Sequence, residues 1–177
     1  LVEKGVLTAD QKSGADAILY VSDISAASQA DLVIEAATEN PELKFRIFKE
    51  LDEAAPSGAI LASNTSSISI TRIAASTRQP ERVIGMHFMN PVPVMRLVEV
   101  IRGLGTSDPT LNTVMSTCRA MGKEPVLVND APGFVSNRIL CPMINEAIFA
   151  LQEGVARAED IDTVLRLGMN HPMGPLA

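Results

Sequence analysis

Tryptophan is absent from the sequence, and aromatic residues account for only 3% of its 177 residues. Positive charge is also scarce, because 15 Lys and Arg stand against 21 Asp and Glu and the formal net charge is −6. A surface that binds nucleic acid needs clustered Lys or Arg and aromatic rings on which bases stack. We therefore expect no nucleic-acid partner, and instead a small molecule or a second copy of the chain.

Cysteine is nearly absent as well. Cys118 and Cys141 are too few for a disulfide framework and lack the spacing of metal ligands, so we expect no metal site and a reducing, cytoplasmic compartment. No apolar run reaches about 18 residues, the length of a membrane span, and the first residues lack the basic and apolar parts of a signal peptide. A soluble protein without a membrane partner is expected.

An initiator methionine is missing too. Residues 1–14 have the pattern of a helix end that leads into a loop, and residues 168–177 stop where a new helix would begin. These ends predict that the sequence is the middle part of a longer protein.

The sequence does contain an alternation of strand-like and helix-like segments. Short β-rich runs predict strands over 31–37, 58–63, 82–88, 96–101 and 124–130. Apolar spacing and capping residues predict helices over 41–55, 64–77 and 107–123, and the pattern is helical from 131 onward. This alternation is typical of an α/β fold with a mostly parallel sheet. We expect two domains, at 1–130 and 131–177.

Two of these helices carry more specific predictions. Pro41 suits a first helical turn, where no N–H is needed. The expected apolar face of that helix consists of Leu43, Ile47 or Phe48, and Leu51. In the helix at 107–123, Asp108 is the expected cap.

The segment "RGLGTSDP" resembles a phosphate-binding glycine turn, because Gly103 and Gly105 lie between an expected strand and an expected helix. However, Asp108 occupies the position of the third glycine, and a negative charge at a helix N-terminus repels phosphate. We interpret the segment as a capped loop.

An imidazole and a carboxylate interrupt the apolar runs of two neighbouring strands. In an extended strand Leu97, Glu99 and Ile101 share one face, so the carboxylate of Glu99 lies among aliphatic side chains. An unpaired buried charge is strongly destabilising, and His87, across a proline turn, is the nearest candidate partner. From these residues alone, a core histidine beside an edge-strand glutamate is the simpler interpretation.

Four motifs together change that interpretation. "ASNTSSISI", "GMHFMNPVPVMRLVEVI", "DAPGFVSNRIL" and "LGMNHPMGPL" occur in this order over most of the chain. In these motifs the sequence resembles the L-3-hydroxyacyl-CoA dehydrogenase family, and most closely its 3-hydroxybutyryl-CoA members. The resemblance implies a Rossmann-like NAD-binding domain, here without its first βαβ unit and glycine turn, followed by a truncated all-α dimerisation domain. It also implies NAD as cofactor, an acyl-CoA substrate, a homodimer and an active site between the domains.

The resemblance assigns His87 and Glu99 to the catalytic pair of the family. Neutral imidazole can take the hydroxyl proton of a secondary alcohol, and a carboxylate on the other ring nitrogen fixes the tautomer. Ser66 matches the serine that hydrogen-bonds the 3-oxygen of the substrate, and Asn137 the asparagine that positions substrate across the cleft. From the residues alone, Ser66 lies among helix-capping hydroxyls and Asn137 is an ordinary polar residue of a helix.

The cofactor is expected at the carboxyl end of the strand over 31–37. By the same resemblance, Glu39 and Lys44 match residues that contact the nicotinamide-side ribose and phosphates, and Ser66 and Asn90 complete the cofactor-binding set. Two alternatives stay open: Glu39 and Lys44 can form a solvated face, and Asn90 can simply fix the proline turn.

Two other functions remain open at this point. A relative with the same catalytic pair could act on a 3-hydroxy acid or a sugar acid, and a crystallin-like or structural relative could lack activity altogether. The sequence leaves undecided the acyl-chain length, the choice between NAD and NADP, and the metabolic direction.

Overall fold

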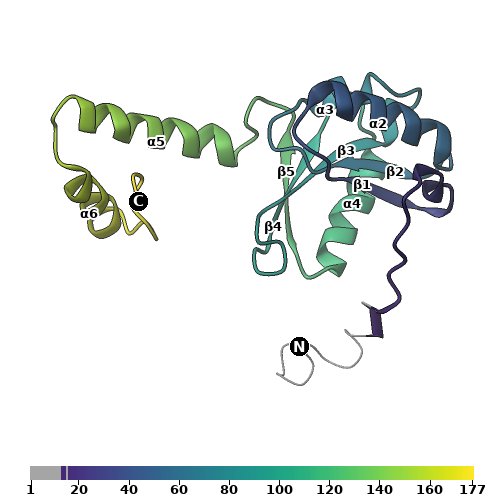
Figure 1. The fold of residues 1–177 in the computed structure, drawn as a ribbon, viewed down its shortest axis with the longest axis horizontal. Helices are drawn as coiled ribbons and strands as arrows, with labels where there is room; N and C mark the ends of the chain where they lie inside the picture. The colour runs from purple at the N-terminus through teal and green to yellow at the C-terminus, as the bar shows by residue number, and fades with distance from the viewer. Residues whose placement is uncertain (1–12, 15) are drawn as a thin grey trace.

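The computed structural model describes residues 13, 14 and 16–177 as a layered sheet domain from which a helical arm projects (Figure 1). The predicted helix end over 1–14 therefore falls almost wholly outside the described residues. The elements follow in the order η1 (Ile24–Gln29), β1 (Leu32–Glu35), α2 (Pro41–Ala54), β2 (Ile60–Ser63), α3 (Ile70–Ala74), η2 (Pro80–Arg82), β3 (Val83–Phe88), β4 (Leu97–Arg102), α4 (Asp108–Ala120), β5 (Glu124–Asn129), α5 (Ser136–Gln152) and α6 (Ala158–Gly168).

In the part of the chain that the structure describes, five strands form one sheet in the order β1-β2-β3-β4-β5. β1, β2 and β3 are parallel, as are β4 and β5, whereas β3 and β4 are antiparallel. The proline turn between β3 and β4 is too short for a helical crossover, which is why this one pair reverses direction. The predicted α/β fold with a mostly parallel sheet is confirmed.

Helices cover both faces of the sheet, with α2 and α3 on one side and α4 on the other (Figure 1). Alternate strand residues supply the two cores, as the period of two in a strand requires. Leu61, Val83 and Ile101 pack with the residues of α2 and α3, while Ala62 and Val100 belong to the core under α4.

The buried face of α2 differs from the predicted one. Asn40 caps the helix through its side chain, which accepts a hydrogen bond from the Leu43 amide at 3.0 Å, and Pro41 begins the first turn as expected. However, the buried residues are Lys44, Phe48, Leu51 and Asp52. Leu43 and Ile47 are only half-buried, because two charged residues that find buried partners take their places on the inner face.

The N-cap of α4 is Ser107 and not Asp108 as predicted. The Ser107 hydroxyl accepts from the Thr110 amide at 3.3 Å, and Asp108 pairs instead with Arg102 at 2.7 Å. The helix stops before Gly122, whose φ of 72° suits a residue without a side chain.

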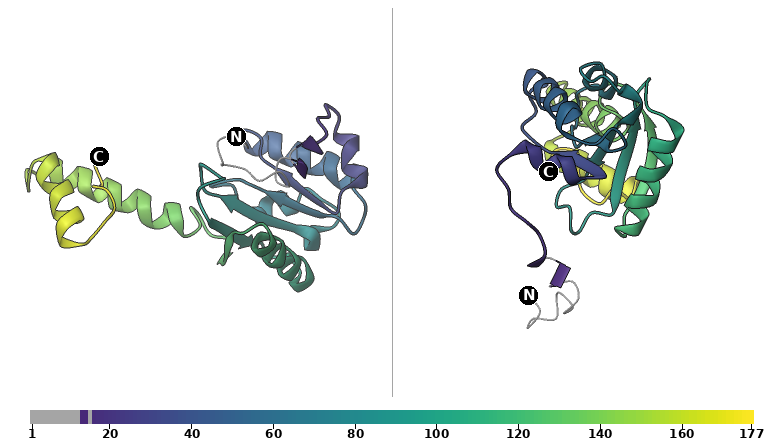
Figure 2. Two further views of the ribbon diagram at one scale, coloured as in Figure 1. Left: turned by 90° about the horizontal axis from the view of Figure 1, so that it is seen from below. Right: turned by 90° about the vertical axis from the view of Figure 1, so that its right-hand side faces the viewer.

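The arm begins with α5, which starts at Ser136 and thus five residues later than the helical pattern suggested. Gly133 and Phe134 precede it with φ values of 78° and 51°, so the chain turns sharply here before it leaves the sheet domain. Figure 2 shows α5 running away from the sheet, with α6 folded back at its far end. No residue of α5 is buried, and its exposed apolar side chains include Ile139, Leu140, Ile148, Phe149 and Leu151.

Within the described residues, no helix has both the length and the apolar character needed to cross a membrane.

Candidate active site

The expected site residues lie around the carboxyl ends of the parallel strands. β1 and β2 finish in register at Glu35 and Ser63, and β3 passes beside them towards His87. The loops that follow β1 and β2 carry Glu39 and Ser66. Ligands of open α/β sheets bind at this edge, because the loops after the strands leave a crevice there.

His87 and Glu99 lie directly opposite each other in the antiparallel β3–β4 pair. His87 Nδ1 is 2.8 Å from Glu99 Oε2, and the two residues are only 6% and 2% exposed. The predicted contact between them is therefore confirmed. Since a carboxylate can only accept, the bond requires the proton on Nδ1 and leaves Nε2 as the free base of the neutral ring. The ring of Phe134 packs against the imidazole with 5.8 Å between centroids.

Glu99 also binds the start of the helical arm. Its Oε1 accepts from the amides of Val135 at 3.1 Å and Ser136 at 2.9 Å, and its Oε2 accepts from the Ser136 hydroxyl at 2.9 Å. Burial alone would raise the pKa of Glu99, but the hydrogen bonds from His87, Ser136 and Val135 outweigh it and lower the pKa below its ordinary value. Glu99 is thus a carboxylate at neutral pH.

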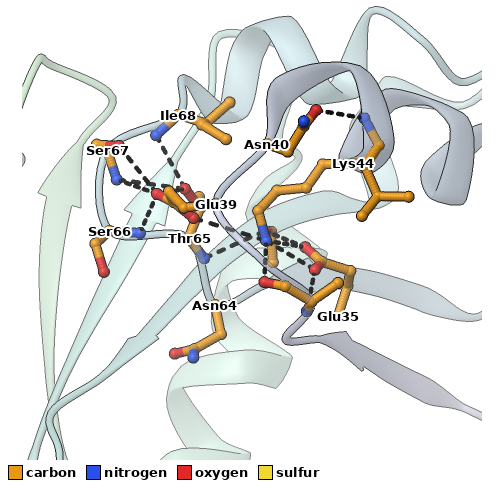
Figure 3. Close-up of polar contacts among 12 residues, drawn as sticks. Glu35, Glu39, Asn40, Lys44, Asn64, Thr65, Ser66, Ser67 and Ile68 are labelled. Atoms are coloured by element: carbon orange, nitrogen blue, oxygen red, sulfur yellow. Dashed lines mark hydrogen bonds and ion pairs between the residues drawn. The ribbon is translucent and has the colours of Figure 1, made fainter.

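The loop after β2 is organised around Glu39 (Figure 3). Glu39 Oε1 accepts from the Thr65 hydroxyl at 2.6 Å, and from the Ser66 amide, the Ser67 amide and the Ser67 hydroxyl at 2.9 Å each. Burial raises the pKa of Glu39, but these hydrogen bonds and the charge of Lys44 lower it overall. In Figure 3 the Ser66 hydroxyl points away from this cluster.

Asn137 reaches the same loop from the arm. Its Nδ2 donates to the Ser66 carbonyl oxygen at 3.2 Å, although the two residues are 71 positions apart in the chain. The structure thus brings Asn137 next to Ser66.

Lys44 lies deeper than the sequence suggested. It is 1% exposed, and its Nζ donates to Glu35 Oε1 at 2.8 Å, to Glu35 Oε2 at 3.0 Å and to the Ala37 carbonyl at 3.0 Å (Figure 3). The Ser63 hydroxyl adds a bond of 2.7 Å to Glu35 Oε2. Sequence reasoning missed Glu35 and Ser63, although a carboxylate at the end of the apolar run "LVIE" was a signal. Lys44 Nζ is also 3.7 Å from Glu39 Oε2, so its charge lies close to the loop cluster.

Asn90 is exposed in the proline turn, where it precedes Pro91 through a cis peptide bond. The neighbouring backbone is held by Asn64, whose Oδ1 accepts from the Phe88 amide at 2.9 Å. Asn64 was not singled out from the sequence. The role of Asn90 stays a prediction, as do the roles of the other residues assigned to the site.

Asp130 fixes the segment that leads from β5 to the arm. Its carboxylate accepts from the Ser69 hydroxyl at 2.7 Å, the Ile70 amide at 3.1 Å and the Thr71 amide at 2.8 Å, which form the first turn of α3. Burial raises the pKa of Asp130, but its hydrogen bonds to Thr71, Ser69 and Ile70 lower it overall. This residue, also missed, anchors the chain three residues before the turn at Gly133 and Phe134, and Phe134 packs against His87.

Comparison with known proteins places nearly the whole chain in one family. Residues 1–131 match the model of the 3-hydroxyacyl-CoA dehydrogenase NAD binding domain, and residues 133–177 match that of the 3-hydroxyacyl-CoA dehydrogenase C-terminal domain. A probable 3-hydroxybutyryl-CoA dehydrogenase of Bacillus subtilis (strain 168) is 60% identical over 99% of this chain and 61% of its own length. The mitochondrial hydroxyacyl-coenzyme A dehydrogenase of Homo sapiens is 48% identical over 85% of this chain and 48% of its own length.

Solved structures give the same result for the fold. The (S)-3-hydroxybutyryl-CoA dehydrogenase of Ralstonia eutropha superposes with a TM-score of 0.95 at 53% identity, over 99% of this chain and 62% of that one. A 5-formyl-3-hydroxy-2-methylpyridine-4-carboxylic acid 5-dehydrogenase superposes with a TM-score of 0.79 at 39% identity, over 85% of this chain and 49% of that one. The chain thus spans about three fifths of two of these relatives, 61% of the Bacillus subtilis protein and 62% of the Ralstonia eutropha chain.

Proposed function

The chain belongs to the 3-hydroxyacyl-CoA dehydrogenase family, and we propose that the full-length protein catalyses the reversible NAD-dependent oxidation of short-chain L-3-hydroxyacyl-CoA, such as 3-hydroxybutyryl-CoA, to 3-oxoacyl-CoA. The observation that carries this proposal is the buried His87–Glu99 pair, with 2.8 Å between Nδ1 and Oε2. The high identity to 3-hydroxybutyryl-CoA dehydrogenases supports the substrate class.

His87 serves as the general base of the proposed reaction. Its Nε2 takes the proton of the 3-hydroxyl while the hydrogen on C3 leaves as hydride, so that C3 becomes a carbonyl carbon. NAD, when bound, supplies the acceptor for that hydride. Glu99 fixes the Nδ1–H tautomer and stabilises the imidazolium that forms, since it lies 2.8 Å away as a carboxylate. In the reverse direction the imidazolium returns the proton to the oxygen.

Ser66 and Asn137 orient the substrate oxygen in this proposal. The Asn137 amide is held at the Ser66 carbonyl, and the Ser66 hydroxyl is directed away from Glu39 (Figure 3). Both groups come from loops or helix starts at the edge of the sheet that carries His87, where two hydrogen-bond donors can meet one substrate oxygen.

Glu39, Lys44, Ser66 and Asn90 are the proposed cofactor-binding residues. The carboxylate of Glu39 suits ribose hydroxyls, because four donors hold it in place while its side chain stays 40% exposed. Lys44 is fully engaged with Glu35 and Ala37, so the geometry favours a role exerted through Glu39, whose Oε2 is 3.7 Å from Nζ.

The remaining parts of the proposal concern assembly and location. We infer a homodimer formed through the helical domain at 131–177, because α5 buries none of its residues and exposes several large apolar side chains. Cys118 and Cys141 are free thiols, in keeping with a reducing, cytoplasmic location.

A second candidate is a related dehydrogenase that acts on a hydroxy acid without CoA. The similarity to the pyridine-carboxylic acid dehydrogenase favours it, since that protein shares the scaffold at 39% identity and is named for a different substrate. A non-catalytic, crystallin-like relative is the third possibility.

One assay separates the three. The full-length protein is incubated with NADH and either acetoacetyl-CoA or acetoacetate, with His87→Gln as the matched inactive control. We expect NADH oxidation with acetoacetyl-CoA that exceeds the rate with acetoacetate and falls at least about 100-fold in the variant. Preference for the free acid would favour the second candidate, and a rate equal to that of His87→Gln with both substrates would favour the third.

A further inference from the structure

Ser136 is the first residue of α5, one position after the N-cap. A serine at the N-cap itself would use its hydroxyl to accept from an amide of its own helix. Here the Ser136 hydroxyl donates to Glu99 Oε2 at 2.9 Å, and this is the same oxygen that binds His87 Nδ1 at 2.8 Å. One carboxylate oxygen therefore receives both the imidazole and the hydroxyl.

The Glu99 carboxylate has a second role, which is to cap the N-terminus of α5. Val135, the N-cap residue of α5, makes no capping bond with its side chain. Glu99 Oε1 supplies the capping acceptor instead, because it accepts hydrogen bonds from the amides of Val135 and Ser136. A carboxylate at a helix N-terminus is stabilised both by these amides and by the helix dipole.

We propose that Ser136 is a positioning residue for the His87–Glu99 pair, whose hydroxyl shares Glu99 Oε2 with the imidazole and thereby limits how strongly the carboxylate holds a proton on His87. The inference rests on the proposed function, and it adds a residue to which the sequence assigned no role.

The direction of the effect follows from the charge on Oε2. A hydrogen bond donated to a carboxylate oxygen draws off part of its negative charge and weakens its attraction for a second donor. Without the hydroxyl, the full charge of Oε2 acts on the imidazolium, so His87 would keep its proton to a higher pH. A base that must be neutral to accept the substrate proton would then work only at higher pH.

Among the described residues, the hydrogen-bonding and ring contacts of the pair are with uncharged groups. In the described residues, Glu99 forms hydrogen bonds with His87, the two amides and the Ser136 hydroxyl, and the ring of Phe134 packs on His87. The two amides donate to Oε1 and remain when the hydroxyl is removed. Ser136→Ala thus deletes one neutral donor from one oxygen and leaves the cap of α5 in place.

The test is an NMR titration of the His87 ring in the full-length protein, with the His87 signal assigned by its loss in His87→Gln. We expect Ser136→Ala to raise the titration midpoint of His87 by roughly half a pH unit, as the loss of one net hydrogen bond would allow. Ser136→Thr, which keeps the hydroxyl, should stay close to wild type. Ser76→Ala is the matched control, because Ser76 is also half-buried but donates to the Ile73 carbonyl at 2.7 Å, away from the site.

Enzyme kinetics give a second readout with the same sign. In the oxidation direction, the acidic limb of the kcat profile should move to higher pH in Ser136→Ala by the amount of the NMR shift, with the KM for the acyl-CoA changed less than about twofold. Glu99→Gln should move that limb the opposite way, to lower pH, because the imidazolium loses its stabilising charge. General damage to the site would not give two shifts of opposite sign.

An unchanged or lowered midpoint in Ser136→Ala would overturn the proposal, and so would an equal rise in Ser136→Thr or Ser76→Ala. If Ser136→Ala fails to fold, Ser136→Cys takes its place, with a rise in the same direction because a thiol is a weak donor. A wild-type protein without turnover would overturn the proposed function alone, since the NMR midpoints would still decide the role of Ser136.

Discussion

Strand β3 is flanked by two buried carboxylate networks, one at each end, and they differ in what they can do. At its amino end, Arg82 Nη2 donates to Asp52 Oδ1 at 2.8 Å, and Arg78 Nε donates to Asp52 Oδ2 at 2.8 Å. Near its carboxyl end, His87 meets Glu99 at the same distance of 2.8 Å. Asp52 and Glu99 are buried alike, at 4% and 2% exposure.

The difference lies in the partner. A guanidinium keeps its charge at every pH at which the protein folds, so the Asp52 network can only hold α2 against the start of β3. An imidazole changes charge near neutral pH, so the Glu99 network can take up and release a proton. The same geometry therefore serves stability at one end of the strand and proposed catalysis at the other.

The largest expected effect is on the carboxyl-end network. In the full-length protein, Glu99→Gln keeps shape and an acceptor but removes the charge that stabilises protonated His87. We expect kcat to fall by about 10²- to 10⁴-fold, with a much smaller change in the KM for the acyl-CoA. His87→Gln should cost a similar factor and the double variant little more, because the two residues act as one unit. Steady-state kinetics with acetoacetyl-CoA and NADH measure all three.

The control for this prediction is the melting temperature. If Glu99→Gln keeps kcat within about threefold of wild type, or loses activity only in step with its melting temperature, then Glu99 is a structural residue like Asp52.

The contact between His87 and Glu99 could be predicted from the sequence, but the contact between Glu99 and Ser136 could not. His87 and Glu99 lie on neighbouring strands joined by a short proline turn, so antiparallel pairing brings them together by local geometry. Ser136 is 37 positions from Glu99, and its contact depends on where α5 starts. That start is set by the positive φ of Gly133 and Phe134, which no periodicity reveals.

The order of strands and helices was predictable for a similar reason, because periods of two and of 3.6 are local properties. The inner face of α2 was not. Lys44 and Asp52 are charged residues that periodicity places on a solvated face, and they are buried only because Glu35 and Arg82, from other elements, lie opposite them. Partners that lie on other secondary-structure elements decide the burial of a charge.

The next effect tests the amino-end network. Asp52→Asn leaves Arg82, which is only 5% exposed, without its charged partner. We expect the free energy of unfolding to fall by about 3 kcal/mol, as is typical when one member of a buried ion pair is removed. Urea denaturation of the full-length protein measures the loss, and kcat should stay within about twofold of wild type. A large loss of kcat at unchanged stability would remove the distinction between the two ends of the strand.

Acid should weaken the same network. Burial raises the pKa of Asp52, but its bonds to Arg78 and Arg82 and the charge of Arg82 lower it from 3.8 to about 2. Because the folded pKa is the lower one, this stabilisation is present above the unfolded pKa of 3.8 and is lost as the pH falls towards 2. The shift corresponds to about 2 kcal/mol. Between pH 6 and pH 2, the free energy of unfolding should therefore fall by about 2 kcal/mol less in Asp52→Asn than in wild type. Equal losses in the two proteins would contradict the prediction.

The smallest effect separates the two arginines of the amino-end network. The side chain of Arg78 is 72% exposed, whereas that of Arg82 is 6% exposed, although both contact Asp52 at 2.8 Å. Arg78→Ala removes a solvated ion pair, and its backbone amide, 3.0 Å from Asp52 Oδ2, still donates. We expect a loss below about 1 kcal/mol for Arg78→Ala and about 3 kcal/mol for Arg82→Ala, which removes the buried partner of a buried carboxylate. Urea denaturation at pH 7 measures both, and equal losses would mean that exposure does not govern this network.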